Sequence, residues 1–138
     1  MLQWNENIAG TFNELHSFEK RLNKKLVHAG LRPGIICSLE LAIEEMVSNI
    51  IKHGYKNKTG IIHFEVNIEI DEINILIVDS AGKFNPIEYS KRFAAAKPPF
   101  HSGNGIKLAK GFIDSMSYKR FNDLNILKLT LFQEKFQI

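Results

Sequence analysis

A carboxylate, a carboxamide and an imidazole recur at four-residue intervals near the middle of the chain, at Glu45, Asn49 and His53. Each residue of an α-helix turns by about 100°, so residues four apart drift by only about 40° around the axis. In a helix the three side chains would form one row that can share a ligand. Glu44 turns well away from Asn49, which makes Glu45 the better candidate for general-base chemistry. Taken alone, the row also fits an ordinary solvated helix face.

A second motif follows the apolar segment 73–78, where the chain continues as Asp79-Ser80-Ala81-Gly82-Lys83-Phe84-Asn85-Pro86. A carboxylate at the end of a strand can accept a hydrogen bond from an amine, such as the exocyclic amino group of adenine. Asp, Ser, Gly, Asn and Pro are also common turn residues, so a plain turn is the alternative interpretation.

A third motif, Ser102-Gly103-Asn104-Gly105-Ile106, precedes a segment from Ile106 to Met116 that we expect to be helical. Paired glycines let backbone N–H groups approach a phosphate, and the N-terminus of a helix favours an anion. The motif lacks the full spacing of a dinucleotide fingerprint and the lysine of a P-loop, so it is weak when taken alone.

The order of the three motifs resembles the GHKL (Bergerat) ATP-binding fold of histidine-kinase-like ATPases. Within that fold, the chain is most similar to the anti-sigma-factor serine/threonine-protein kinases of bacteria, and the resemblance covers essentially the whole sequence. The first box of that family is matched by Glu45, Asn49 and His53, and the third by Gly103 and Gly105. The second is matched by Asp79, Phe84 and Pro86, with Asn85 at a position where the family has aspartate.

The resemblance implies ATP and Mg²⁺ as cofactors. It assigns Asn49 as the metal ligand, Asp79 as the reader of adenine and Glu45 as the catalytic base. His53 would either orient the site or pack beneath the turn at Gly54. The implied nucleotide-binding residues are Asn49, His53, Asp79, Ala81, Gly82, Phe84, Lys97, Gly103, Asn104, Gly105 and Ile106.

The function implied by the resemblance is that of a regulatory kinase and anti-sigma factor. Such a protein phosphorylates an anti-anti-sigma (STAS-type) protein and binds a sigma factor in a partner-switching system, usually as a homodimer. Two alternatives stay open: an ATP-binding regulatory module without catalysis, and a detached histidine-kinase ATPase domain. Neither the sigma factor nor the phosphorylated residue can be named from the sequence.

Three departures from the family pattern affect the expected nucleotide affinity. Ala81 stands where the family usually has glycine, and Ile106 replaces the usual leucine. The segment 124–127 offers no clear equivalent of the family's Gly-Thr pair. Alanine is small enough for close approach, but a backbone angle that only glycine favours would be strained there. We therefore expect reduced affinity rather than loss of binding.

Composition sets broad limits on the protein class. The 138 residues are 44% hydrophobic, carry a formal net charge of +3 and include one cysteine, Cys37, which rules out an internal disulfide. We expect a single domain over residues 1–138, with Cys37 packed on an apolar helix. We find no run of the roughly 18 apolar residues that span a membrane, no signal peptide and no nucleic-acid-binding motif. The cytoplasm is therefore the expected compartment.

Hydrophobic periodicity predicts the elements that would position the motifs. Helical spacing favours a first helix from the capping sequence at Thr11 to Gly30 and a second from Pro33 to Gly54. Alternation predicts strands over 62–70, 73–78 and 127–131, and an edge strand over 2–8. A short helix can begin at Pro86, and residues 88–102 resemble the lid of the family. The expected fold is α+β, a two-layer sandwich with a mixed, mainly antiparallel sheet covered on one face by helices.

Overall fold

The computed structural model describes residues 2–94 and 113–133. These form an α+β fold with a five-stranded sheet in the order β1-β2-β3-β5-β4, and every neighbouring pair in it is antiparallel. The α+β prediction is confirmed, and the sheet has no parallel pair among its described strands. The elements are β1 (Leu2–Ala9), α1 (Phe12–His28), α2 (Pro33–Asn49), η1 (Ile50–Gly54), β2 (Ile61–Ile68), β3 (Glu72–Asp79), α3 (Pro86–Ala94), β4 (Ser115–Phe121) and β5 (Leu124–Phe132).

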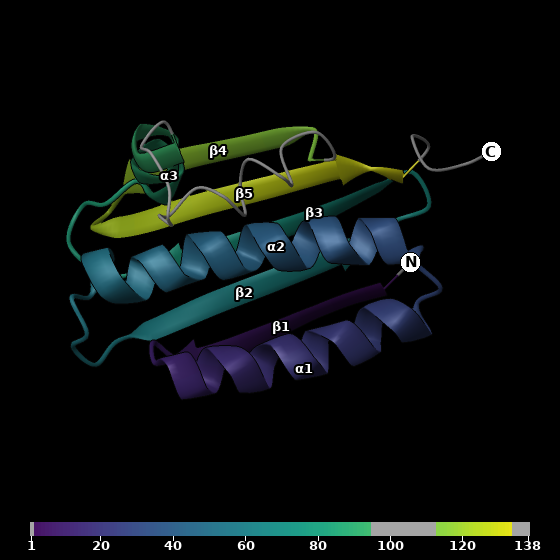
Figure 1. Cartoon of the computed structure of the whole chain (residues 1–138), viewed down its shortest axis with the longest axis horizontal. Coiled ribbons are helices and arrows are strands. Elements are labelled where there is room, and N and C mark those ends of the chain that lie inside the picture. Colours follow the sequence, from purple (N-terminus) through teal and green to yellow (C-terminus); the bar gives the residue numbers. More distant parts are fainter. Residues whose placement is uncertain (1, 95–112, 134–138) are drawn as a thin grey trace.

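The helices α1 and α2 lie side by side over one face of the sheet (Figure 1), and α3 contacts α2 and β4. The core forms between these two layers, where Phe18 of α1 stacks on Phe64 of β2 with ring centroids 4.0 Å apart. One hydrophobic cluster runs from Ile8 in β1 to Leu131 in β5. Burial of apolar surface between the layers therefore fixes both helices on the sheet.

The ends of α1 follow the capping signals in the sequence. The Oγ1 of Thr11 accepts a hydrogen bond from the backbone N–H of Glu14 at 3.2 Å. At the other end Gly30 has φ +80, and its N–H donates to the Val27 carbonyl while that of Leu31 donates to Leu26. This pair of bonds is a Schellman motif, which needs a residue that tolerates the left-handed region.

Helix α2 begins at Pro33 and continues into a π-helical turn, η1, in which the N–H of Tyr55 donates to the carbonyl of Ile50 at 2.8 Å. The predicted second helix therefore ends at Gly54, as expected. The apolar stripe of this helix is buried and consists of Ile36, Leu39, Ile43, Met46, Val47 and Ile50.

Two polar residues continue the buried face of the sheet at its end. In β3, Ile73, Ile75 and Ile77 face the helices, and the next residue on that side is Asp79. Asp79 lies opposite Asn125 of β5 in the register of the two strands, and both side chains are buried. The alternation of β-strands thus places a carboxylate and a carboxamide together beneath the helix layer.

The strand β4 was not predicted. The expected helix from Ile106 to Met116 is wrong at its end, because Met116 lies in β4, while residues 106–112 lie outside the described residues. The strand escapes a periodicity search because its alternation breaks down, with Arg120 on the half-buried inner side and the apolar Phe121 on the exposed side. A turn joins it to β5 at Asn122 and Asp123, which have φ of 49 and 62. Two consecutive positive φ values are typical of a type I′ hairpin, in which asparagine and aspartate are favoured.

Cys37 is exposed, so the expectation that it packs in the apolar face of its helix is wrong. Its neighbours Ile36 and Ser38 are buried, and Cys37 lies on the outward side of α2.

Among the residues that the structure describes, no helix is both long and apolar enough to cross a membrane.

Candidate functional site

The residues of the Glu-Asn-His row come to lie beneath the helix that follows the second motif. Asn49 is fully buried, and Glu45 and His53 are half-buried. Asn49 is the last residue of α2 and His53 belongs to η1, so the row crosses the point where the helix widens into a π turn. The widened turn changes the rotation per residue, yet all three side chains still contact the neighbouring helix α3.

Helix α3 contacts the row through two consecutive residues. The Nδ2 of Asn49 donates to the Oγ of Ser90 at 3.0 Å, and that hydroxyl is 3.5 Å from the Oε1 of Glu45, to which it donates. Ser90 is itself fully buried. The ring of His53 lies 4.3 Å from that of Tyr89. One turn of α3 therefore covers all three residues of the row.

The environment of Glu45 suits a proton acceptor. Burial raises the pKa of this carboxyl above its ordinary value, and the nearby Glu44 carboxylate adds to the rise, while the Ser90 hydroxyl and Lys52 oppose it. A carboxylate with a raised pKa is a stronger base toward a hydroxyl group. The hydrogen bond from Ser90 shows that a serine hydroxyl can reach the Glu45 oxygen.

Asp79 is almost completely buried, and its Oδ1 accepts hydrogen bonds from the Nδ2 of Asn125 at 2.8 Å and from the N–H of Ala81 at 3.0 Å. Burial raises the pKa of the carboxyl, and these two hydrogen bonds and Arg120 oppose that rise. A buried carboxylate with fixed donors is held in one orientation. Recognition of a planar base would require a carboxylate that is fixed in this way.

Asn125 is a residue of the site that sequence reasoning missed. Its Nδ2 also contacts the carbonyl oxygens of Ala81 at 3.3 Å and Gly82 at 3.0 Å. Its Oδ1 accepts from the N–H of Phe84 at 3.3 Å and from the hydroxyl of Tyr118. One carboxamide thus holds the whole turn after β3. The signal was the position of Asn125 on the inward-facing side of its alternating strand, where an unpaired amide is costly.

The turn accommodates alanine where the family usually has glycine. Among the described residues with positive φ are Gly30 and four non-glycine residues, and Ala81 is not one of them. The strain expected at Ala81 is therefore absent. The Ala81 side chain is buried and would lie 3.5 Å from a Cβ placed on Gly54. At Gly82 an added Cβ would meet nothing within 4 Å, so neither position of the turn demands glycine in this conformation.

Three aromatic side chains join the row to the turn. The His53 ring contacts both Tyr89 and Phe84, at centroid distances of 4.3 and 6.1 Å, and Phe84 lies 5.6 Å from Tyr89. Burial and the nearby Lys52 lower the pKa of His53, which favours the neutral ring. His53 packs against this cluster beside Gly54, which agrees with the packing interpretation.

The remaining predicted site residues, Lys97, Gly103, Asn104, Gly105 and Ile106, lie outside the described residues. Within the described residues, the first two motifs meet where the ring of His53 lies against that of Phe84.

The chemistry of the described side chains fits Mg²⁺, which prefers hard oxygen ligands such as carboxamides and carboxylates. Asn49 and Glu45 supply both types within one helical turn. Asn49, however, has no exposed surface while α3 covers it. A metal ion could reach this carboxamide only after the contact with Ser90 opens.

Comparison with known proteins was decisive for the family. Residues 11–131 match the sequence family described as "Histidine kinase-like ATPase domain". The chain belongs to this histidine kinase-like ATPase family. An ATPase domain implies ATP as the ligand, and the GHKL resemblance of the sequence is thereby confirmed.

Similar proteins include anti-sigma F factors. Those of Clostridium kluyveri and Thermoanaerobacter pseudethanolicus are each 30% identical over 83 residues, which cover 59% of this chain and 58% of each relative. The chain thus matches a little over half the length of these curated relatives. A crystal structure of the RsbU and RsbW domains of a Mycobacterium tuberculosis protein superposes with a TM-score of 0.68 and 16% identity. The superposition covers 95% of this chain and 32% of the Mycobacterium tuberculosis chain. It shows that the two proteins share a fold.

Proposed function

We propose that this ATPase domain is a regulatory serine/threonine-protein kinase and anti-sigma factor. It binds Mg–ATP, transfers the γ-phosphoryl group to a hydroxyl of an anti-anti-sigma (STAS-type) protein, and binds a sigma factor in a partner-switching system. The observation that carries the proposal is the contact of a serine hydroxyl with Glu45 beside Asn49. The similarity to anti-sigma F factors supports the choice of partners.

In this mechanism Asn49 would hold the Mg²⁺ through its side-chain oxygen, and the ion would neutralise charge on the triphosphate. Asp79, fixed by Asn125 and Ala81, would accept from the adenine amino group. Glu45 would take the proton of the attacking hydroxyl, a role favoured by its raised pKa. Gly103, Asn104, Gly105 and Lys97 are proposed to contact the phosphates.

We also propose that residues 1–138 form one domain, which acts in the cytoplasm as a homodimer. The continuous hydrophobic cluster from β1 to β5 supports the single domain. The resemblance of the sequence supports the dimer and the compartment.

A non-catalytic ATP-binding module is the second candidate, because Asn49 is completely covered in the observed conformation.

The first prediction separates the kinase from the non-catalytic module. The Glu45→Gln variant should still bind Mg–ATP, because it keeps the shape of the side chain, but it should lose at least about 100-fold in transfer, the usual contribution of a general base. Labelled Mg–ATP is incubated with the full chain and each STAS-type protein of its own genome, and phosphate on serine or threonine is measured.

The exposed Glu88→Gln variant of α3 serves as the control for the loss of a nearby carboxylate. Transfer by the parent chain and by Glu88→Gln, with none by Glu45→Gln, is the expected result. If Glu45→Gln transferred phosphate as fast as the parent, the assignment of Glu45 as the general base would be wrong. If the parent bound Mg–ATP but transferred no phosphate, the result would favour the non-catalytic binding module.

A further inference from the structure

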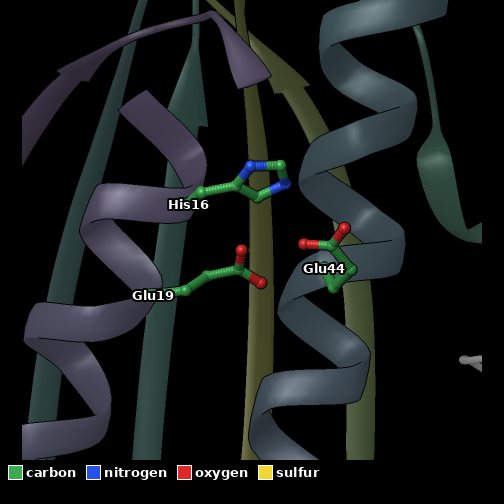
Figure 2. Close-up of side chains that lie close together, drawn as sticks. All are labelled: His16, Glu19 and Glu44. Atoms are coloured by element: carbon green, nitrogen blue, oxygen red, sulfur yellow. The ribbon is translucent and has the colours of Figure 1, made fainter. Parts of the chain in front are cut away.

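A second group of potential metal ligands lies on the other side of α2. His16 and Glu19 project from α1 and Glu44 projects from α2 toward the same space between the helices (Figure 2). One ligand atom from each of the three residues lies within 4.8 Å of the others. His16 and Glu19 are three residues apart, so they share a helix face, and Glu44 faces them from the neighbouring helix. Two carboxylates and an imidazole are thereby brought together.

The two carboxylates of this group lack the cation that such a pair normally has. None of the ion pairs among the described residues involves Glu19 or Glu44. The Oε2 of Glu44 is buried and has no hydrogen-bond partner in the described part of the chain. A buried acceptor without a partner costs free energy, which a bound cation would recover.

The electrostatics of the pair agree with this geometry. Burial is the main cause that raises the pKa of Glu19 to about 8. A hydrogen bond that protonated Glu19 donates to Glu44, and repulsion from Glu44 and Glu40, add to the rise. A divalent cation would remove the repulsion between Glu19 and Glu44. Both carboxylates also line a cavity of about 590 Å³ between α1 and α2, which gives an ion a path from solvent.

We propose that His16, Glu19 and Glu44 form a binding site for a divalent transition-metal ion, with Zn²⁺ as the best fit. The imidazole selects against Mg²⁺ and Ca²⁺, which prefer all-oxygen sites, and Zn²⁺ binds strongly to histidine and carboxylate. Because His16 is exposed, a water molecule can complete the coordination. The ion would link α1 to α2, and it would lie on the flank of α2 that faces α1, whereas Glu45 faces α3.

The test is direct titration of the untagged full chain with Zn²⁺, in competition with a chromophoric chelator and without nucleotide. The parent should bind one equivalent of Zn²⁺, and Zn²⁺ should raise its melting temperature, as any ligand that binds only the native state does. His16→Ala and Glu44→Gln should each weaken binding by more than about tenfold. His28→Ala removes an exposed histidine at the far end of α1 and serves as the matched control.

Binding by the parent and by His28→Ala, with loss in both ligand variants, is the result that supports the site. No binding to the parent chain would overturn it, as would equal affinities in all four proteins or displacement of Zn²⁺ by millimolar Mg²⁺. Urea unfolding of each variant without metal confirms that it folds. Because neither ATP nor a protein substrate is present, the outcome is independent of the proposed kinase activity.

Discussion

At the scale of single residues, the site depends on polar side chains that are buried and mutually hydrogen-bonded. Asp79 is held by Asn125 and by the backbone of Ala81, and Asn49 is held by Ser90. In a low-dielectric environment such networks are rigid when they are complete and costly when one member is removed. The two asparagines therefore have different roles: Asn49 is a candidate ligand, and Asn125 positions the carboxylate that would read the base.

Replacing Asn125 by alanine should destabilise the protein by about 2–4 kcal/mol. The change leaves the Phe84 N–H and the Tyr118 hydroxyl without their acceptor and removes one donor from Asp79. It should also weaken ATP binding, because Asp79 loses its fixed orientation. Urea unfolding and calorimetric ATP titration measure the two effects.

Asn74→Ala is the matched control, since Asn74 lies on the open face of the sheet and accepts one hydrogen bond, from Thr130. It should cost only about 1 kcal/mol and leave ATP affinity unchanged. If Asn125→Ala were no more destabilising than Asn74→Ala, the network assigned to Asn125 would be wrong.

At the scale of elements, α2 carries candidate ligands on the two flanks that face its neighbouring helices. Glu45 turns toward α3 and the adjacent Glu44 turns toward α1, since consecutive residues of a helix point about 100° apart. Since α2 is packed on the sheet between the two neighbouring helices, each flank is partly buried. The positions of α1 and α3 therefore decide which ligands can reach it.

Replacing Ser90 by alanine should increase ATP affinity by up to about fivefold. The hydroxyl stabilises the conformation in which α3 covers Asn49, and a hydrogen bond contributes about 1 kcal/mol. Binding selects the open conformation, so a less stable cover leaves more of the protein competent to bind. Calorimetric titration with Mg–ATP measures the change.

Ser38→Ala provides the comparison for this variant, since Ser38 is a buried serine of α2 whose hydroxyl donates to the carbonyl of Gly34, away from the row. It should leave ATP affinity unchanged. Weaker binding by Ser90→Ala would instead mean that the hydroxyl contacts the nucleotide complex.

The contact between α1 and α2 should make stability depend on pH. The pKa of Glu19 is raised from 4.5 to about 8, so the native state holds its proton more tightly than the unfolded chain does. The free energy of unfolding should therefore fall as the pH rises from about 4.5 to 8. We expect Glu19 to contribute about 1–2 kcal/mol to this fall, because solvent screens a partly exposed group.

Glu19→Gln should flatten this dependence, and Glu14→Gln, on the exposed first turn of α1, should not. Urea unfolding at pH 5 and pH 8.5, with EDTA to exclude bound metal, measures the difference. A parent protein that is equally stable at both values, or a Glu19→Gln variant with the parent's slope, would contradict the prediction.

At the scale of the whole molecule, the sequence predicted those elements that have strong periodicity and clear end signals. Helix α1, from its Thr11 cap to Gly30, and the antiparallel pair β2 and β3 are as expected. The strand β4 was missed because its alternation is weak, although the Asn122-Asp123 turn marks it. The row at Glu45 could be found because its spacing is local to one helix.

The network around Asn125 could not be found from local spacing, because it joins residues 41–46 positions apart in the chain. The contacts of Ser90 with Glu45 and Asn49 could not be predicted for the same reason, because these partners lie 45 and 41 positions away in the chain. The group at His16, Glu19 and Glu44 likewise depends on the packing of two helices. Tertiary contacts therefore supplied the parts of the site that no single segment encodes.

The central claim is that Asn49 binds the metal ion of a Mg–ATP complex, and calorimetric titration of the full chain with ATP tests it most directly. We predict that ATP binds the parent chain with strong dependence on Mg²⁺, and that Asn49→Ala abolishes this binding while the control Asn74→Ala retains it. No detectable binding to the parent at millimolar ATP, or equal affinity of Asn49→Ala and the parent for Mg–ATP, would contradict the account.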